Sequence, residues 1–444
     1  MKRLMLAALM LCVCGAALSQ RASTDLAQRA ESGYVRLDGR VLEDDGGPFL
    51  GLGASLFWGV WSYDHDRARL IQHFDLLHSH GFDFVRVLGV VTGTSWSDRA
   101  ADPRAPGYDN AIAGLTELAF EHGLRIAWTI FGDIVAAPTP TSRLAIVDRF
   151  AVMAEGREQK IFSIEIANEG WQNGFGNNLG ELDQLVRHLK ARTPLLVTST
   201  APPAPLRCDP ALMALYGPGA ADFVTLHFDR NIATADGRWG PIRQAMKWSS
   251  AVAPCREKLP AAAASGEPIG PQASVASEED PLRIVAGAVV TYTAGIPIYV
   301  LHTGPGVRGG GEADRALQRA TSLMDLPRIN ELLQAFAAMK QYLPPDLSGW
   351  SRFDASSAEG PAQIQAATPE REPVDVAAAR RGDEFVVVPF GIRDRLSLQV
   401  AAASRVEVIH PATGERLLQQ RLARGGKMEL PAGVDALVII GRAS

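Results

Sequence analysis

Short apolar runs recur along roughly the first two thirds of the chain, and each is followed by a longer stretch with helical spacing. The runs are rich in Val, Ile, Leu and Phe, and several are continuous, as expected for strands buried on both faces. Their starts lie about 30 to 40 residues apart, the length of one strand–helix unit. The pattern predicts eight buried strands: Phe49–Phe57, Phe82–Val90, Leu124–Phe131, Ile161–Asn168, Pro194–Thr198, Asp222–Phe228, Leu259–Glu267 and Ile296–His302.

The stretches between the runs carry helix signals. Asp64–His80 and Tyr108–His122 have apolar residues at helical spacing and are each followed by a glycine, while Ser142 is expected to cap a helix and Pro281 to begin one. Eight such units predict an α/β protein with a (β/α)8 TIM barrel. A doubly wound sheet is the alternative, but it usually has a phosphate-binding first turn, which Leu56–Trp61 does not provide.

The barrel is expected to have a small element before it and another after it. Tyr34–Leu37 and Arg40–Glu43 flank an Asp-Gly turn and predict a hairpin that plugs the barrel floor. Near the other end, β periodicity with glycine turns predicts a small C-terminal antiparallel β-sandwich. The predicted division is 1–19 signal peptide, 20–345 barrel with its hairpin, 346–373 linker or irregular entry, and 374–444 sandwich.

Composition and charge exclude two classes of protein. The chain has 444 residues, of which 47% are hydrophobic and 21% are charged, as in an ordinary folded globular protein. The net charge of −5 lacks the basic balance of a nucleic-acid-binding protein. Beyond the N-terminus the chain has no apolar run of about 18 residues, so it is not a multi-span membrane protein.

The N-terminus has the order of a secretory signal peptide. A short basic start precedes the apolar stretch Leu4–Leu18, and a small-x-small cleavage site ends at Ser19. We expect a mature protein that is secreted or periplasmic and is not held in the membrane. Two cysteines then remain, Cys208 and Cys255, and the sequence is equally compatible with one disulfide and with two free buried thiols.

Two of the predicted strands end in a glutamate. The fourth run leads into Asn168-Glu169-Gly170 and the seventh into Gly266-Glu267-Pro268. In a barrel, catalytic groups come from the carboxyl ends of strands, and strands four and seven lie across its mouth. Glu169 and Glu267 can therefore face one another over a substrate. Two carboxylates about 5 to 5.5 Å apart, one a proton donor and one a nucleophile, are what retaining glycoside hydrolysis requires.

Four stretches together resemble the clan A glycoside hydrolases, the cellulase-like (β/α)8 group. Gly81–Val87 resembles the second strand of the clan with its arginine, and Asn168-Glu169 resembles the acid/base motif. Thr225–Asp229 resembles the sixth-strand histidine segment, and Gly266–Pro268 resembles the nucleophile segment. The resemblance covers roughly residues 34 to 343, and a β-sandwich is often appended to such enzymes.

The resemblance implies a role for each matching residue. Glu169 would be the general acid and then the general base, and Glu267 would be the nucleophile. Asn168 would hydrogen-bond the sugar 2-hydroxyl, Arg86 would pair with Glu267 and keep it ionised, and His227 would line the site near Glu169. The partner would be an oligo- or polysaccharide, and no cofactor or metal is implied.

The sequence also departs from the pattern of the clan. Many members carry a tyrosine two residues after the histidine, which donates to the nucleophile, but here the position is Asp229. Tyr63 is a candidate to take that role. The strand-eight tryptophan typical of many members is missing from Tyr299–Gly304. These departures bear on the substrate class more than on the type of reaction.

Several of these residues have plainer interpretations. Glu165 is expected to face the same way as Glu169 but deeper in the barrel, where a carboxylate needs a partner. Arg86 could be that partner in place of the nucleophile. His227 is equally compatible with a satisfied interior histidine, and His302 is expected to be structural or to lie behind the site.

Tryptophans follow several predicted strand ends, where an aromatic face can stack on a sugar ring or simply pack in the core. Trp171, beside the acid/base motif, is predicted as a subsite together with Asn173, and Trp58 is a further candidate. The histidines of the first helix lack the i,i+4 spacing of metal ligands. Gly304–Gly309 matches GxGxxG but is not followed by a second strand with an acidic end, so no dinucleotide site is predicted.

The sequence thus predicts an exported retaining glycoside hydrolase that cleaves O-glycosidic bonds by double displacement. A non-catalytic carbohydrate-binding protein on the same fold and a transglycosylase are the alternatives. The C-terminal sandwich is expected to brace the barrel rather than to bind glycan, because 384–444 lacks a broad set of aromatic residues.

Overall fold

The computed structural model describes residues 32–444 except 177, 218, 220, 231–236, 269–279, 310, 312–313, 315, 317–318 and 368–373. The predicted signal peptide lies outside the described residues. Across the described ranges, no helix combines the length and the apolar character needed to span a bilayer.

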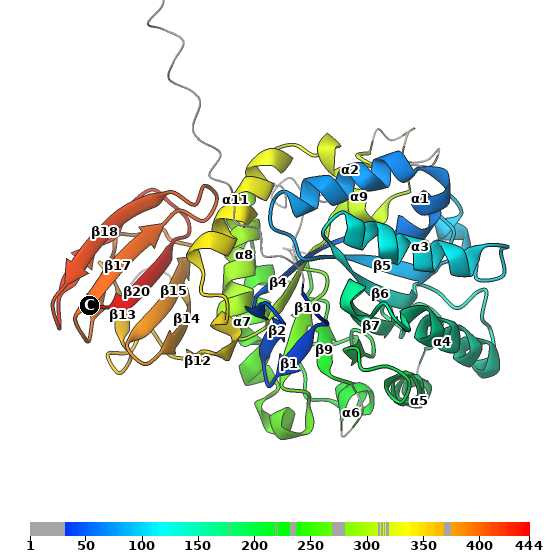
Figure 1. Cartoon of the computed structure of the whole chain (residues 1–444). Coiled ribbons are helices and arrows are strands. Elements are labelled where there is room, and N and C mark those ends of the chain that lie inside the picture. The colour runs from blue at the N-terminus through cyan, green and yellow to red at the C-terminus, as the bar shows by residue number, and fades with distance from the viewer. Residues whose placement is uncertain are drawn as a thin grey trace, which may run out of the picture.

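The larger part of the molecule is a parallel β-barrel surrounded by helices (Figure 1). Its strands follow the order β8-β7-β6-β5-β4-β11-β10-β9, which confirms the predicted fold class and the eight predicted strand positions. The strands are β4 (Gly51–Ser55), β5 (Phe84–Val90), β6 (Arg125–Phe131), β7 (Ile161–Ala167), β8 (Val197–Thr198), β9 (Phe223–Leu226), β10 (Ala262–Ser265) and β11 (Ile298–Leu301).

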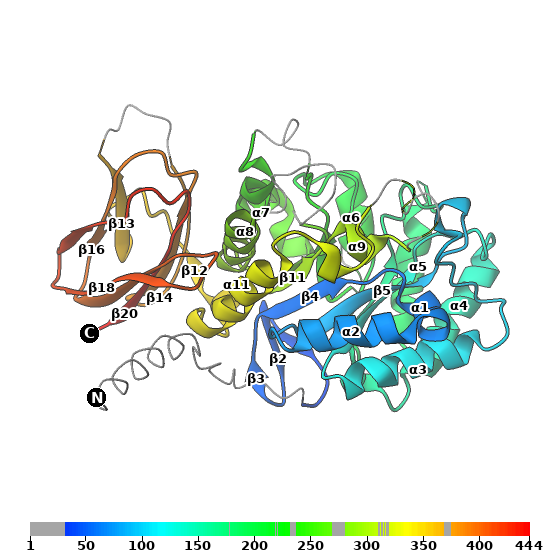
Figure 2. The same cartoon turned by 90° about the horizontal axis from the view of Figure 1, so that it is seen from above.

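The helices cover the outside of the barrel, and short 3-10 turns join several of them (Figure 2). The α-helices are α1 (Gly59–His65), α2 (Arg67–His78), α3 (Tyr108–Glu121), α4 (Pro140–Ala154), α5 (Leu179–Lys190), α6 (Pro210–Tyr216), α7 (Gly240–Ala251), α8 (Pro281–Thr293), α9 (Gly304–Val307) and α11 (Ile329–Tyr342). The 3-10 turns are η1 (Thr94–Trp96), η2 (Glu158–Lys160), η3 (Ala253–Lys258), η5 (Leu323–Asp325) and η6 (Leu347–Gly349).

Two helix boundaries differ from the prediction. The predicted helix Asp64–His80 is broken at Asp66, whose backbone is not helical and whose side chain caps α2 by accepting from the Arg69 amide at 3.3 Å. Ser142 is not the cap of α4: Thr139 is, and the Ser142 amide donates to its hydroxyl at 3.1 Å. In both cases a short polar side chain competes for backbone amides near the boundary.

The predicted hairpin forms and closes the floor of the barrel. Asp44, at the end of its second strand, pairs with Arg125 of β6 at 2.9 Å, and both side chains are fully buried. Phe49 packs edge-on against Phe162 with ring centroids 6.5 Å apart. The strands of this sheet are β1 (Arg36–Asp38), β2 (Val41–Asp44) and β3 (Gly47–Pro48).

The C-terminal part is a sandwich of two antiparallel sheets, as predicted, with strand orders β12-β14-β15-β20-β17-β18 and β13-β16-β19. Segment 346–373 is not only a linker, because it supplies β12 and β13. The alternation of buried and partly exposed residues in β13 is a weak strand signal, because the buried Ala362 and Ile364 alternate with glutamines. The strands are β12 (Ser351–Arg352), β13 (Ala362–Ala366), β14 (Asp375–Arg381), β15 (Glu384–Phe390), β16 (Leu396–Val400), β17 (Ser404–Ile409), β18 (Arg416–Leu422), β19 (Lys427–Glu429) and β20 (Val438–Ala443).

The six-stranded sheet packs against the helices of the barrel (Figure 2). Trp239, just before α7, contacts Phe390 of β15 with ring centroids 5.5 Å apart. Arg243 of α7 pairs with Asp375 of β14 at 2.7 Å. The two parts therefore share an apolar core with an ion pair at its edge, which is a physical basis for the expected bracing role.

Cys208 and Cys255 are joined by a disulfide, with their Cα atoms 6.0 Å apart. The structure thus decides between the two alternatives that the sequence left open. The bond ties the loop before α6 to η3.

Replacing both cysteines with serine is expected to lower the free energy of unfolding by about 3 to 4 kcal/mol, because a cross-link across a loop of this length restricts the unfolded chain. Urea denaturation under non-reducing conditions measures the difference. The single variant Cys208→Ser should match the double variant, since both lose the same bond. Equal stability of the double variant and the wild type would contradict the prediction.

Candidate active site

Charged side chains from several strands meet at the carboxyl ends of the barrel strands, where a (β/α)8 barrel carries its reactive groups. The cluster combines glutamates, arginines and histidines in a largely buried space. Its members are Arg86 on β5, Glu165 on β7, Asn168 and Glu169 after β7, His227 and Arg230 after β9, Glu267 after β10 and His302 after β11.

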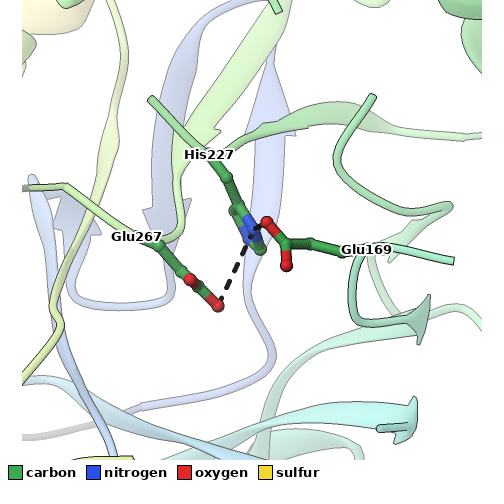
Figure 3. Close-up of side chains that lie close together, drawn as sticks. All are labelled: Glu169, His227 and Glu267. Atoms are coloured by element: carbon green, nitrogen blue, oxygen red, sulfur yellow. Dashed lines mark hydrogen bonds and ion pairs between the residues drawn. The ribbon is translucent and has the colours of Figure 1, made fainter. Parts of the chain in front are cut away.

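The two predicted catalytic glutamates face one another, with a histidine between them (Figure 3). One carboxylate oxygen of Glu169, one of Glu267 and a ring nitrogen of His227 all lie within 4.8 Å of one another. His227 Nδ1 lies 3.1 Å from Glu169 Oε1 and 3.7 Å from Glu267 Oε1. Glu267 is buried, whereas 22% of the Glu169 side chain is exposed, so Glu169 is the glutamate on the solvent side.

Arg86 binds both of the partners that the sequence left as alternatives. Its Nη2 donates to Glu165 Oε2 at 2.8 Å, and its Nη1 donates to Glu267 Oε1 at 3.1 Å. Nη2 also donates to Asn168 Oδ1 at 2.8 Å, which fixes the orientation of that amide. Thr129 completes the cluster by donating to Glu165 Oε2 at 2.7 Å. One guanidinium therefore holds side chains from β7 and from the segments that follow β7 and β10.

The surroundings of Glu267 keep its carboxylate ionised. Burial acts to raise the pKa of Glu267, but the electrostatic influence of His227, His302, Arg86 and Arg230 outweighs it and holds the pKa below its usual range. Burial also lowers the pKa of His302 to about 3, so that histidine is neutral at neutral pH. Arg86 and Arg230 carry permanent charges, so their attraction for the Glu267 carboxylate persists at neutral pH.

Arg230 and His302 contact Glu267, although neither was among the predicted site residues. Arg230 Nη2 lies 3.4 Å from Glu267 Oε2, and His302 Nε2 lies 3.6 Å from the same oxygen. The other ring nitrogen of His302 shares a hydrogen bond of 2.9 Å with the Ser55 hydroxyl. Arg230 follows one predicted strand and His302 is the last residue of another. That position was the available signal, but only contact with the glutamate gives the two residues a role.

The candidate tyrosine does not reach the site. Tyr63 lies against Gly114 of α3, and Arg67 stacks over its ring at 4.0 Å. Arg230 instead occupies a place beside Glu267 that an uncharged tyrosine hydroxyl was expected to take. Glu267 thus lies beside a charged guanidinium rather than a neutral hydroxyl donor.

The predicted role of Trp58 is wrong. Its side chain is fully buried, donates from Nε1 to the Pro305 carbonyl at 2.8 Å and lies under the Arg69 guanidinium at 3.9 Å. The ring therefore packs in the core and has no free face for a sugar. A position after a strand did not reveal this, because the chain turns there directly into α1.

Trp171 and Asn173 follow shortly after Glu169, and their surroundings differ. Trp171 has 38% of its surface exposed, so its predicted subsite role stays a prediction. The side chain of Asn173 donates to the Asn168 carbonyl at 2.7 Å and thereby supports the backbone of the motif. Glu169 has a φ of 44°, a left-handed conformation that is costly for a residue with a side chain and that recurs at functional sites.

The same three side chains could in principle hold a metal ion, since Glu169, His227 and Glu267 each offer a ligand atom. The charges beside them argue against a cation. Glu267 already lies against two guanidinium groups, Arg86 at 3.1 Å and Arg230 at 3.4 Å, and both would repel a metal ion. The arrangement fits a pair of carboxylates in different environments better than a metal centre.

No family model and no curated protein matches the chain. Solved structures share its fold at low identity. An exo-beta-1,4-mannosidase from Opitutaceae bacterium strain TAV5 aligns with a TM-score of 0.50 and 13% identity, over 69% of this chain and 62% of the other. A GH5_18 structure from Streptomyces cattleya, in complex with GlcNAc, aligns with a TM-score of 0.50 and 14% identity, over 67% and 82%.

A third structure, the gamma-CGTase from an alkalophilic Bacillus clarkii, aligns with a TM-score of 0.51 and 8% identity, over 90% of this chain and 65% of the other. At such identities the likeness establishes the (β/α)8 barrel fold, which this chain shares with glycoside hydrolases such as the GH5_18 structure.

The lowered pKa of Glu267 makes folding stability depend on pH. A carboxyl whose folded pKa lies below the unfolded value of about 4.3 stabilises the fold above that value, and the contribution is lost as the pH falls toward the folded pKa. Glu267→Gln should therefore unfold more easily than the wild type at pH 6. The gap should narrow by about 1 to 2 kcal/mol at pH 3.

Urea denaturation at both pH values measures this gap. The exposed Glu121→Gln variant is the control and should show the same gap at both. A gap for Glu267→Gln that stays constant or widens on acidification would contradict the assignment of a stabilised Glu267 carboxylate.

Proposed function

We propose that the protein is a retaining glycoside hydrolase that cleaves O-glycosidic bonds of an oligo- or polysaccharide by double displacement. The observation that carries the proposal is the short distance between the two glutamates, whose nearest oxygens lie within 4.8 Å. Retaining enzymes have carboxyl groups about 5 to 5.5 Å apart, whereas inverting enzymes need about 6.5 to 9.5 Å to admit a water.

The environments of the two glutamates divide the roles between them. Glu267 is buried and held ionised by Arg86 and Arg230, as a nucleophile requires. Glu169 lies nearer to solvent, where a leaving group departs and a water enters. Its carboxyl group shares a hydrogen bond with His227 Nδ1. This bond can form when Glu169 is protonated and when it is ionised, as an acid/base group requires.

The reaction then proceeds in two balanced steps. First, the Glu267 carboxylate attacks the anomeric carbon while Glu169 gives its proton to the departing glycosidic oxygen, so one C–O bond forms and one breaks. Second, Glu169 takes a proton from a water whose oxygen attacks the same carbon, and the bond to Glu267 breaks. The two inversions leave the anomeric configuration unchanged.

Asn168 is placed to bind the sugar. Arg86 donates to its side-chain oxygen, which leaves the amide nitrogen available as a donor to a sugar hydroxyl. A contact of this kind can strengthen in the transition state. The solved structures with this fold add support for a carbohydrate ligand, because they include an exo-beta-1,4-mannosidase and a complex with GlcNAc.

Replacing either glutamate should abolish turnover with little effect on binding. We expect Glu267→Gln to lower the rate by about 10⁴-fold or more, since the nucleophile is lost, and Glu169→Gln by about 10²- to 10⁴-fold. Release of new reducing ends from a panel of plant, fungal and bacterial polysaccharides measures the rate. The exposed Glu121→Gln variant and addition of a chelator should both leave it unchanged.

The two alternatives give different results in the same assay. A carbohydrate-binding protein without activity would release no reducing ends from any glycan and would bind equally well in all variants. A transglycosylase would lose activity in the same variants but would convert an oligosaccharide into longer products, which product-length analysis detects.

We further propose that the chain is exported. The support is the order of basic start, apolar stretch and cleavage site that ends at Ser19. Expression with the complete N-terminus, followed by fractionation and N-terminal sequencing, should give a mature protein outside the cytoplasm that begins at Gln20. Full-length protein retained in the cytoplasm would contradict the proposal.

A further inference from the structure

The barrel has a seam between β8 and β9, the two ends of the strand order. Near the floor, the two strands are joined directly, because the Asp222 amide donates to the Val197 carbonyl at 2.8 Å. Nearer to the carboxyl ends of the strands, a side chain joins the two sides of the seam. The hydroxyl of Tyr216, at the end of α6, bonds to Thr200, just after β8, and to Thr225 of β9.

The Tyr216 hydroxyl makes all the hydrogen bonds that a hydroxyl can make, two as acceptor and one as donor. It accepts from the Thr200 amide at 3.2 Å and from the Thr225 amide at 3.1 Å, and it donates to the Thr200 carbonyl at 2.8 Å. The residue is buried, and burial raises the pKa of its hydroxyl to about 12. The group therefore keeps its proton through the physiological range and serves as donor and acceptor at once.

Both segments that Tyr216 joins lead to Glu169. On one side, the Thr200 hydroxyl accepts from the Gly170 amide at 2.9 Å, and Gly170 follows directly after the strained Glu169. On the other side, Thr225 lies two residues before His227, so the position of its backbone sets where the histidine ring stands. That ring is 3.1 Å from Glu169 Oε1.

We propose that Tyr216 is a positioning residue for Glu169: its hydroxyl fixes the backbone of the acid/base position through Thr200 and the ring of His227 through Thr225. The inference rests on the proposed function, because it assigns Glu169 the acid/base role. Glu267 is also held by Arg86 and Arg230, at 3.1 and 3.4 Å, and His227 Nδ1 lies nearer to Glu169 (3.1 Å) than to Glu267 (3.7 Å). Loss of the hydroxyl should therefore weaken proton transfer more than nucleophilic attack.

The test uses Tyr216→Phe in the full chain, which removes the hydroxyl and keeps the ring. Substrates with a poor leaving group need the proton of Glu169, whereas activated aryl glycosides need it far less. We expect kcat/KM to fall about 10- to 100-fold for the poor leaving group and less than about threefold for the activated one. An equal fall for both would overturn the positioning role.

Tyr292→Phe is the matched control. Its hydroxyl is equally buried and donates to a barrel strand, at 2.9 Å from the Gly51 carbonyl, but it lies away from the seam. This variant should show no dependence on the leaving group. A dependence equal to that of Tyr216→Phe would mean that any buried tyrosine hydroxyl in the barrel has the same effect, and would overturn the proposal.

Thr200→Val provides a second variant in case Tyr216→Phe folds poorly. It keeps the shape of the side chain but removes the oxygen that accepts from the Gly170 amide. It should reproduce the dependence on the leaving group while leaving the seam intact. A uniform loss of rate in this variant, without that dependence, would contradict the path from Tyr216 through Thr200 to Glu169.

Hydrogen exchange separates failure of this inference from failure of the proposed function. In Tyr216→Phe, the amides of Thr200, Thr225 and Gly170 should exchange faster, while the amides of β5 and β6 should not change. Unchanged exchange at the three amides would overturn the inference whatever the activity. If the wild type had no activity on any glycoside but Tyr216→Phe showed the expected faster exchange, the proposed reaction would be overturned. The hydrogen bonds of Tyr216 across the seam between β8 and β9 would still be established.

Discussion

The charge of Arg86 inside the barrel is the constraint on which the site depends. A guanidinium does not give up its proton in a protein, so a buried arginine requires partners that balance it. Glu165, Glu267 and Asn168 supply them on different sides of the group, at 2.8 to 3.1 Å. One buried cation thus places the candidate nucleophile and the amide that can meet the sugar before any substrate arrives.

The second feature of the site is that its two glutamates are held by different parts of the barrel. Glu267 is fixed by the permanent charges of Arg86 and Arg230. Glu169 stands on a strained backbone and shares a hydrogen bond with the ring of His227. In the proposed reaction, this difference allows two chemically identical groups to serve as nucleophile and as acid/base at one pH. Arg230 here stands where a tyrosine was expected.

Much of the fold could be predicted, because strands buried on both faces leave apolar runs such as Ile161–Asn168 in the sequence. The glutamates could be predicted as well, since a barrel brings the ends of its strands together. The direction of Trp58 and the role of Arg230 could not, because they depend on how loops turn after a strand. The strand at Ala362–Ala366 was missed, because alanine and glutamine carry little β signal.

The anomeric configuration of the first product tests whether Glu169 and Glu267 act by double displacement, because the configuration follows from the distance between the two glutamates. Proton NMR, recorded as a cleaved oligosaccharide forms and before the product mutarotates, distinguishes the two outcomes. Double displacement predicts that the product keeps the configuration of the bond that was cut. An inverted product would contradict it, since inversion requires a water between carboxylates that here lie within 4.8 Å of one another.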